Sequence, residues 1–560
     1  MPPDPPTGAH VLARTLETLG VREVFTIAGD HVLPAIDAMA DGPFRFIDTR
    51  HEQAAAHMAD AWARITGRPG VVLATTPGFA NVVPALANAA HAESPMLSIG
   101  GSAPLSQLGR GAMQEIDQVG MARPVTKLSE IVTDAARIPD MVAAALRTAL
   151  TGRRGPVHLT IPVDIQQQAV SEAQIPYLPA SQPPPMGADP AAVDEAARLI
   201  ETARRPVVIA GTAASYGRSG DCLVRFAEAT GVPVMTEGDA RGLISDDHAL
   251  CAGFYDVGLN RAARLVPEAD LVVLAGKRQD LSVGYAMPPA VGDGARLIQI
   301  DPEGREIGRN RSVDVALAGD VDAVLGQLAD RAGEGRPGAA DRSEWLERLS
   351  AERREMEAWL ESLDTDAVPL HAMSVFSELR PLLSAGDSVA FDGGDFGHFG
   401  RAYIPATTPL SHLYFSTFGM LGASMGTTLS MKLANPEGRA ILVTGDGAFG
   451  FNAMELDTAV RLDIPITVIV GNDAAWGIDR QIQIGAYGRP VATDLLPSRY
   501  DVVAKGLGAE GYHVTTRAEL GPALREALAC GRPAVVNVEI SRTVSPRGQL
   551  AVERWRAGGN

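Results

Sequence analysis

Two acidic residues, Asp446 and Asp473, each follow a short apolar run and could together bind a divalent cation. Residues 440–444 and 466–470 are predicted strands, and the amphipathic segment 452–462 between them is a predicted helix. A strand, helix, strand unit of this kind crosses over in a right-handed sense, so its two strands are parallel. Their carboxyl ends then lie side by side, which would bring the two carboxylates into one crevice at the sheet edge.

The residues around Asp446 would suit a diphosphate as well as a metal. Gly445 and Gly447 flank this carboxylate, and Ala448 follows them near the expected start of a helix. Glycines let a ligand approach the backbone closely, and helix starts offer unpaired N–H groups to phosphate oxygens. Carboxylates are the hard oxygen ligands that Mg²⁺ prefers. A Gly-Asp-Gly triplet alone is a common surface turn, so the prediction depends on the second strand and Asp473.

A further carboxylate with possible chemistry lies far upstream. Residues 44–47 are a predicted strand and residues 52–66 a predicted helix with alanines on its packing face, so Glu52 would begin that helix. A carboxylate at this position often does no more than stabilise the helix. General acid-base catalysis by a fixed carboxylate is the less common alternative at such a position.

These segments resemble the thiamine diphosphate motif of the acetolactate synthase-like enzymes, and the similarity runs through nearly all 560 residues. The matching pieces are the Gly-Asp-Gly turn, the Asn-Asp pair that ends at Asp473, and the Arg-His-Glu triplet that ends at Glu52. The resemblance implies that Asp446, Asp473 and the backbone carbonyl of Ala475 bind Mg²⁺. It also implies that Glu52 hydrogen-bonds N1′ of the thiamine aminopyrimidine. Many relatives carry Asn in place of Asp473, and the Asp keeps an oxygen ligand while adding charge.

The same resemblance indicates how the cofactor would be held. Residues 417–422 are similar to the family segment that bends the cofactor over a bulky apolar side chain, which makes Leu421 the expected wedge. An ordinary core leucine is the alternative. Gly393 and Gly394 follow the predicted strand 388–391, and their backbone N–H groups could bind diphosphate oxygens.

Two polar residues are expected near the reactive carbon of the cofactor. His31 follows the predicted strand 24–28, in a segment that resembles benzaldehyde lyase, where a histidine in this position relays protons; an exposed loop histidine is the alternative. The segment around Gln114 is similar to benzaldehyde lyase and 2-hydroxyacyl-CoA lyase, so its amide could hydrogen-bond the substrate or merely cap a turn. The Ala-Phe-Gly-Phe run that begins at Ala448 is typical of 2-hydroxyacyl-CoA lyases and oxalyl-CoA decarboxylases.

These resemblances predict a thiamine-diphosphate-dependent C–C bond lyase that is reversible as a carboligase. It would cleave a 2-hydroxyacyl-CoA to a ketone or aldehyde plus formyl-CoA, with His31 and Gln114 handling the hydroxyl proton. An acyloin lyase of the benzaldehyde lyase type and an acetolactate synthase-like 2-oxoacid decarboxylase stay open. A noncatalytic homologue also stays open, although the presence of Glu52, Asp446 and Asp473 argues against it.

Two other regions could serve a CoA substrate. Predicted strands in the middle of the chain lead to Arg278 and Asp301, a pattern that suits nucleotide phosphate and ribose respectively. An ADP or CoA moiety, FAD and an empty domain are all compatible with this pattern. The tail, residues 541–560, carries Arg547, Arg554 and Arg556 and could fold as a helical lid that touches phosphate, although tails are usually solvated.

Proline-rich and glycine-rich interruptions at residues 175–190 and 332–341 divide an otherwise alternating pattern of strands and helices. We therefore expect three α/β domains with parallel sheets. They are a pyrimidine-binding domain (1–175), a central Rossmann-like domain (190–332) and a diphosphate-binding domain (342–540). In related enzymes the cofactor lies between the first domain of one subunit and the third of its neighbour, which implies a homodimer or homotetramer.

Charge and composition exclude several classes of function. The net charge of −18 argues against a nucleic acid partner, since phosphates need neutralisation by Lys and Arg. No segment approaches the roughly 20 apolar residues of a membrane span, and the proline-rich start lacks the features of a signal peptide. Cys222, Cys251 and Cys530 show no metal-binding spacing. We expect a cytoplasmic enzyme that acts on a small acyl-CoA or acyloin, without a membrane or nucleic acid partner.

Overall fold

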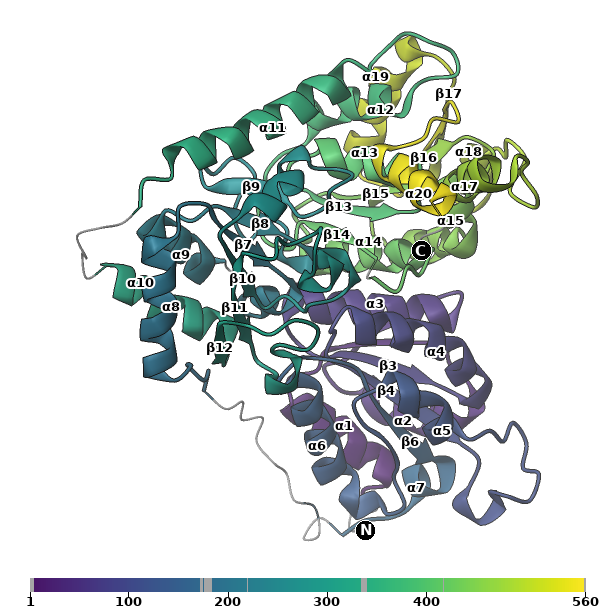
Figure 1. Ribbon diagram of the computed structural model, residues 1–560. Coiled ribbons are helices and arrows are strands. Elements are labelled where there is room, and N and C mark those ends of the chain that lie inside the picture. Colours follow the sequence, from purple (N-terminus) through teal and green to yellow (C-terminus); the bar gives the residue numbers. More distant parts are fainter. Residues whose placement is uncertain are drawn as a thin grey trace. The chain divides into compact units, whose positions relative to one another are not determined.

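The computed structural model describes residues 5–171, 175, 184–218, 220–333, 340–415 and 417–557, so parts of both predicted linkers, 175–190 and 332–341, lie outside it. The chain forms two compact units. The first comprises Met1–Pro184, Phe415–Pro436 and Asn452–Ile464, and the second comprises Pro185–Tyr414, Glu437–Phe451 and Pro465–Asn560. The described residues contain three six-stranded parallel sheets flanked by helices, one in the first unit and two in the second (Figure 1). The predicted α/β class is therefore confirmed.

The sheet of the first unit has the strand order β2-β1-β3-β4-β6-β5. Its strands are β1 (Glu23–Thr26), β2 (Arg45–Asp48), β3 (Gly70–Ala74), β4 (Met96–Ser102), β5 (Ser129–Ile131) and β6 (Val157–Pro162). The helices of this unit are α1 (Gly8–Thr18), α2 (Leu33–Ala40), α3 (Glu52–Thr66), α4 (Thr76–His91), α5 (Gln118–Ala122), α6 (Ile138–Leu150), α7 (Val163–Gln167), α14 (Ala423–Ala434) and α16 (Glu455–Arg461). The strands β3 and β4 are buried along their whole length, as expected when helices cover both faces of a parallel sheet.

Two helices from the C-terminal half of the chain complete the first unit. Helix α14 approaches α3 closely, because a Cβ at Gly426 would lie only 3.1 Å from the Met58 nitrogen, and Ser430 Oγ donates to the Met58 carbonyl at 2.8 Å. Helix α16 contributes Glu455, whose carboxylate accepts from the Arg50 N–H at 3.1 and 3.2 Å. These contacts fix the turn that leads into Glu52.

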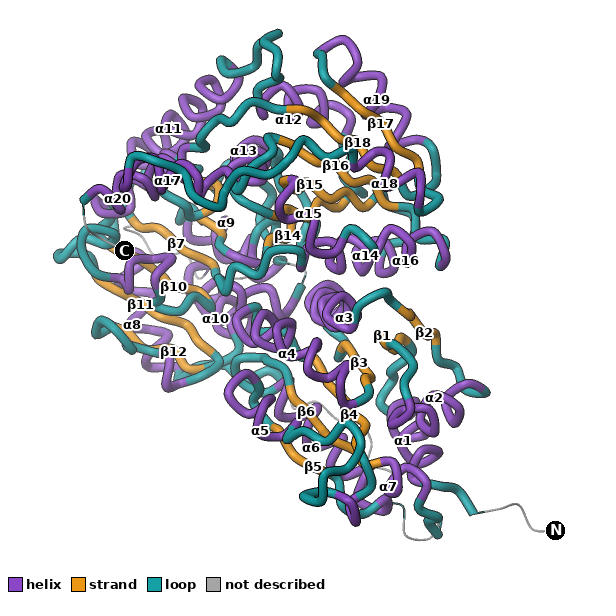
Figure 2. The backbone as a smooth tube through the Cα atoms, turned by 90° about the vertical axis from the view of Figure 1, so that its right-hand side faces the viewer, coloured by secondary structure: helices purple, strands orange, loops and turns teal. Residues whose placement is uncertain are grey.

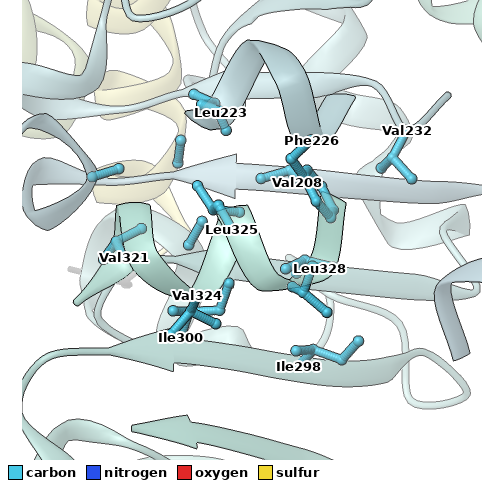
Figure 3. Close-up of a cluster of buried hydrophobic side chains, with 14 of the residues drawn as sticks. Val208, Leu223, Phe226, Val232, Ile298, Ile300, Val321, Val324, Leu325 and Leu328 are labelled. Atoms are coloured by element: carbon cyan, nitrogen blue, oxygen red, sulfur yellow. The ribbon is translucent and has the colours of Figure 1, made fainter. Parts of the chain in front are cut away.

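The first sheet of the second unit has the order β12-β11-β10-β7-β8-β9. Its strands are β7 (Pro206–Ala210), β8 (Val234–Thr236), β9 (Cys251–Phe254), β10 (Leu271–Ala275), β11 (Arg296–Asp301) and β12 (Val315–Ala318), with helices α8 (Pro190–Thr202), α9 (Asp221–Thr230) and α10 (Val321–Gly333). Apolar residues on α10 recur at helical spacing and pack on the strand residue Ile300 and on α9 through Phe226 (Figure 3). Those labelled on α10 are Val321, Val324, Leu325 and Leu328.

The other sheet of the second unit has the order β14-β13-β15-β16-β18-β17, and its strands β15, β16, β17 and β18 are labelled in Figure 2. Its strands are β13 (Ser388–Asp392), β14 (His412–Tyr414), β15 (Ala440–Gly445), β16 (Ile466–Asn472), β17 (Glu510–Val514) and β18 (Ala534–Glu539). Its helices are α11 (Ser343–Glu361), α12 (Ala372–Leu379), α13 (Asp395–Tyr403), α15 (Asp446–Asn452), α17 (Gly477–Tyr487), α18 (Tyr500–Gly506), α19 (Arg517–Ala529) and α20 (Pro546–Arg556). The predicted neighbours β15 and β16 are paired and parallel.

One predicted helix is wrong in its bounds. Residues 452–462 were expected to form a single helix, but helix α15 begins directly at Asp446 and ends at Asn452, and α16 begins at Glu455. The chain turns between them, where the Asn452 amide donates to the Gly422 carbonyl at 3.0 Å. The helix that follows β15 therefore starts at the acidic residue itself.

The tail folds as helix α20, which lies beside α17 (Figure 1). A Cβ at Gly485 of α17 would lie 2.5 Å from Val552, so the two helices are in close contact. Ser545 caps α20, because its Oγ accepts from the Gly548 N–H at 3.0 Å. Nowhere in the described parts of the chain is a helix both long and apolar enough to span a bilayer.

Candidate active site

The two acidic residues predicted to bind a cation lie together at the carboxyl edge of the third sheet. Asp446 directly follows β15, and Asp473 directly follows the neighbouring β16. Burial, reinforced by the Asp473 charge, raises the pKa of Asp446 to about 7, and burial also raises the pKa of Asp473, to about 6. Asp446 Oδ2 is buried without a hydrogen-bond partner among the described residues. A cation between the carboxylates would occupy that oxygen and offset their repulsion.

The turn after β16 is clamped by an arginine that the sequence did not single out. Arg542 donates from Nε to the Asp473 carbonyl at 2.9 Å and from Nη2 to the Ala474 carbonyl at 2.8 Å. Ala474 has a φ of 53°, and the chain reverses there before the buried Ala475. Within the described residues no donor occupies the Ala475 carbonyl, so this oxygen is available to a cation. In the sequence, the only indication that Arg542 reaches this edge is that it lies just after the last strand, β18.

The two glycine loops lie side by side at the same edge. A Cβ at Gly393 would lie 3.4 Å from the Gly445 nitrogen and 3.4 Å from the Ala448 Cβ. Gly393 has a φ of 86°, and the Tyr414 hydroxyl donates to its carbonyl at 3.2 Å, so the loop is held in a conformation that favours glycine. The predicted cofactor residues that share this edge are Gly393, Gly394, Gly445, Asp446, Gly447, Ala448 and Asp473.

The donor set at this edge suits magnesium with a diphosphate. The described residues include no cluster of three or more His, Cys, Asp or Glu side chains that could hold a metal by themselves. A cation here would depend on two carboxylates, a backbone carbonyl and oxygens of a ligand. Mg²⁺ commonly binds in this way, with one or two carboxylates and substrate phosphates. The residues present therefore fit the predicted group.

In the first unit, Glu52 is the first residue of α3 and is partly buried. The Asn81 amide donates to Glu52 Oε2 at 3.0 Å. A Cβ at Gly78 would lie 2.8 Å from Oε1, so α4 approaches this oxygen closely without covering it with a side chain. His51 caps α3 by accepting from the Gln53 N–H at 3.1 Å. The carboxylate is thus held in one orientation, with Oε1 open to a further partner.

His31 lies in a short 3-10 turn, Asp30–Val32, between β1 and α2. Its Nδ1 lies 3.1 Å from Thr76 Oγ1, at the start of α4. Burial lowers the pKa of His31, so the ring is neutral at pH 7. Glu52 contacts the same helix at Gly78. The structure therefore places both predicted proton-transfer groups of this unit against the first turn of α4.

Gln114 makes no hydrogen bond to these groups among the described residues. It is exposed in the loop between β4 and α5, with a φ of 59°. The buried amide of this region belongs instead to Gln118, whose Nε2 donates to Thr76 Oγ1 at 3.1 Å and to the Gly101 carbonyl at 2.8 Å. Sequence reasoning missed Gln118, because a glutamine that follows Asp117 at a helix start is usually solvated.

Leu421 is partly buried in the turn that precedes α14. Within the same segment Phe418 is the more exposed apolar side chain, with 43% of its surface accessible. Its ring lies 5.1 Å from that of His91, between centroids. The segment 417–422 thus presents two apolar candidates for the predicted wedge.

The residues predicted to bind a nucleotide already make contacts within the second unit. Arg278 Nε lies 3.7 Å from the Glu306 carboxylate, and Asp301 is fully buried. The adjacent Lys277 is also buried and is paired with Asp280 at 2.6 Å. The positive charges that could bind a phosphate are therefore largely compensated by acidic side chains of the protein.

The predicted arginines of the tail differ in their surroundings. Arg547 is paired with Asp256, and Arg556 Nε donates to the Gly485 carbonyl at 3.1 Å. Both therefore fasten α20 to the second unit. Arg554 is exposed and makes no ion pair with the described residues. It is the tail cation that stays available to a ligand.

Comparison with known proteins links these sites. Models of the thiamine pyrophosphate enzymes match in order, the N-terminal TPP binding domain at residues 6–121, the central domain at 193–328 and the C-terminal TPP binding domain at 392–538. The chain is 36% identical over 537 residues to a probable acetolactate synthase of Mycobacterium bovis, which covers 94% of this chain and 95% of the relative. It is 32% identical over 591 residues to 2-hydroxyacyl-CoA lyase 2 of Homo sapiens, with 97% and 92% covered. Identity to 2-hydroxyacyl-CoA lyase 1 of Mus musculus is 30% over 560 residues, with 97% and 95% covered.

Proposed function

Because the chain belongs to the thiamine pyrophosphate enzymes, we propose that it cleaves, and in reverse forms, the C–C bond of a 2-hydroxyacyl-CoA. The products would be a ketone or aldehyde and formyl-CoA. Family membership confirms the enzymatic character predicted from the sequence, whereas the choice of substrate is our proposal. Relatives named 2-hydroxyacyl-CoA lyase cover nearly the whole chain and support it.

The observation that carries this proposal is the position of the His31 ring against the start of α4, where burial lowers its pKa. Cleavage of a 2-hydroxyacyl compound requires that the hydroxyl next to the breaking bond lose its proton. A neutral imidazole can accept that proton at pH 7. Decarboxylation of a 2-oxoacid needs no such base in its cleavage step, so a histidine held in this position favours a lyase.

The remaining roles follow from where the side chains lie. Thiamine diphosphate, when bound, supplies a nucleophilic carbon and an electron sink. We assign Asp446, Asp473 and the Ala475 carbonyl to Mg²⁺, and the glycine loops around Gly393 and Gly445 to the diphosphate. Glu52 would hold a proton at Oε1, since Asn81 already occupies Oε2.

An acetolactate synthase activity is the second candidate. It is favoured by the mycobacterial relative of that name, which is 36% identical to this chain. In that case pyruvate would lose carbon dioxide, and His31 would not be needed for the first bond cleavage. An acyloin lyase without CoA is the third possibility, and it would use His31 in the same way as the proposed lyase.

One assay separates these candidates. The purified protein is incubated with thiamine diphosphate, Mg²⁺ and, in turn, a 2-hydroxyacyl-CoA, benzoin and pyruvate, and both fragments are identified by mass spectrometry. We expect formyl-CoA and a carbonyl product from the first substrate, and loss of both in His31→Gln. Carbon dioxide from pyruvate, unaffected by His31→Gln, would instead establish the decarboxylase.

We further propose the assembly implied by the family resemblance. The domains would span residues 1–175, 190–332 and 342–540, and a homodimer or homotetramer would complete each active site from two subunits. The tail, held by Arg547 and Arg556, would close over the substrate. Removal of the residues after Val544 should then lower the turnover of a CoA substrate more than it lowers the affinity for thiamine diphosphate. Unchanged kinetics would contradict the role of the tail as a lid.

A further inference from the structure

A chain of buried side chains leads from His31 into the interior of the first unit. His31 Nδ1 lies 3.1 Å from Thr76 Oγ1, which in turn lies 3.1 Å from Gln118 Nε2 and 2.9 Å from the Gly101 carbonyl. Gln118 Nε2 also donates to that carbonyl at 2.8 Å. Thr76 and Gln118 are 1% and 2% exposed, so water cannot replace these partners.

The protons of this chain can be assigned by elimination. The Gly101 carbonyl only accepts hydrogen bonds, so the Gln118 atom beside it must be the amide nitrogen, which settles the orientation of the amide. That nitrogen only donates, so Thr76 Oγ1 accepts from it. The single hydroxyl proton of Thr76 points to the Gly101 carbonyl, its nearest acceptor at 2.9 Å. Thr76 therefore has a lone pair left for His31, and not a proton.

From this geometry we propose that Thr76 and Gln118 are positioning residues that hold His31 as the Nδ1–H tautomer, with Nε2 left as the proton acceptor. The inference deepens the proposed lyase function and rests on it for the role of His31. Which ring nitrogen of a histidine carries the proton is set by the hydrogen bond that the other nitrogen makes. In water the opposite tautomer, protonated at Nε2, is the more populated one, so the protein would impose the form that serves as a base.

The backbone at His31 is held in place by contacts with neighbouring segments. The Gln166 amide donates to the His31 carbonyl at 2.7 Å and to the Ile161 carbonyl at 2.8 Å. A Cβ at Gly101 would lie 2.1 Å from the His31 carbonyl oxygen, so the turn is seated directly on the end of β4. Because burial also lowers the pKa of His31, the ring is neutral and its tautomer matters at pH 7.

The tautomer can be observed directly, without an activity assay. Protein labelled with ¹⁵N in its histidine rings is loaded with thiamine diphosphate and Mg²⁺, and the His31 signals are assigned from their loss in His31→Gln. We expect a protonated Nδ1 and an unprotonated Nε2 in the wild type. Thr76→Val, which keeps the shape but removes the acceptor, should move the proton to Nε2, and Thr76→Ser should restore the wild-type pattern.

Thr75→Val provides the matched control. Thr75 Oγ1 accepts from the His31 backbone N–H at 3.4 Å and does not contact the ring, so its loss should leave the tautomer unchanged. A wild-type His31 protonated at Nε2, or the same spectrum in Thr76→Val, would overturn the proposal. If Thr76→Val does not fold, Thr76→Ala gives the same test, because it also removes the hydroxyl oxygen beside His31 Nδ1.

Kinetics separate this proposal from the proposed function. We expect Thr76→Val to lower kcat for the 2-hydroxyacyl-CoA about 100-fold with little change in KM, the size of effect typical of a general base. Absence of lyase activity in the wild type, with the Nδ1–H signal present, would remove the proposed function and leave the tautomer assignment standing. Full lyase activity in a wild type whose His31 is protonated at Nε2 would support the proposed function and overturn the tautomer assignment.

Discussion

Replacement of Asp446 by asparagine should make the cofactor-free protein more stable while it abolishes cofactor binding. The folded chain raises the pKa of this carboxyl from its usual 3.8 to about 7, through burial and the Asp473 charge. Folding therefore binds a proton that the unfolded chain releases. Stability from this group is present below pH 3.8 and is lost as the pH rises toward 7.

The size of the effect follows from the shift. Each pKa unit corresponds to about 1.4 kcal/mol, so the wild type loses about 4 kcal/mol from Asp446 by pH 8 and about 1.6 kcal/mol by pH 5. The amide side chain of the variant cannot ionise and avoids the loss. The stabilising effect of Asp446→Asn should therefore be at least twice as large at pH 8 as at pH 5.

The assay is thermal unfolding of both proteins at the two pH values, with and without Mg²⁺ and thiamine diphosphate. The ligands should stabilise the wild type and have no effect on the variant. Asp494→Asn is a suitable control, because Arg480 and Arg542 lower the pKa of exposed Asp494, so its replacement should not stabilise the protein at pH 8. Equal or lower stability of Asp446→Asn at pH 8 without ligands would refute the reasoning, as would unchanged cofactor affinity.

Three other predictions test separate parts of the site. Glu52→Gln and Asp446→Asn should each be inactive alone, and a coexpressed 1:1 mixture of the two should recover about a quarter of wild-type activity. Half of randomly formed dimers would be hybrids, and each hybrid would have one of its two active sites intact. No recovery would show that Glu52 and Asp446 of one active site come from the same chain. Leu421→Ala should lower turnover in the cofactor-saturated enzyme, whereas an effect confined to Phe418→Ala would make the exposed aromatic the wedge. Burial lowers the pKa of His158 to about 3, so this residue should make the unfolding free energy of the wild type fall by about 1.4 kcal/mol per unit, relative to a variant without it, as the pH drops from 6.5 toward 4. His158→Gln should flatten that slope in urea titrations, and an unchanged slope would show that another group causes it.

The carboxyl edge of the third sheet could be predicted because every step was local. An apolar strand, a helix and a second apolar strand permit only a parallel neighbour, so Asp446 and Asp473 had to meet. The helix that begins at Glu52 was equally predictable, since its alanines and its polar start agree. Arg542 could not be found in this way, because it reaches the turn after β16 from the segment that follows β18, about seventy residues later in the chain.

Contacts between distant segments account for what the sequence did not show. Helices α14 and α16 belong to the first unit although they lie more than two hundred residues after its sheet. The hydrophobic pattern of a helix does not show to which unit the helix belongs. The choice between Gln114 and Gln118 depends on which side of a short turn faces β4, and helical spacing does not decide this for a helix of five residues. Tertiary packing decided both cases.

The two groups of candidate residues, one in each unit, differ in electrostatics in a way that matches their proposed tasks. The Thr76 and Gln118 side chains beside His31 are neutral and each of their protons has an acceptor, so the network can fix a direction for proton transfer. Around Asp446 the side chains are ionisable, since the buried Asp446 and the partly buried Asp473 carboxyl groups raise each other's cost of ionisation, and Asp446 Oδ2 has no hydrogen-bond partner among the described residues. Such an arrangement costs stability when empty and is relieved by a cation.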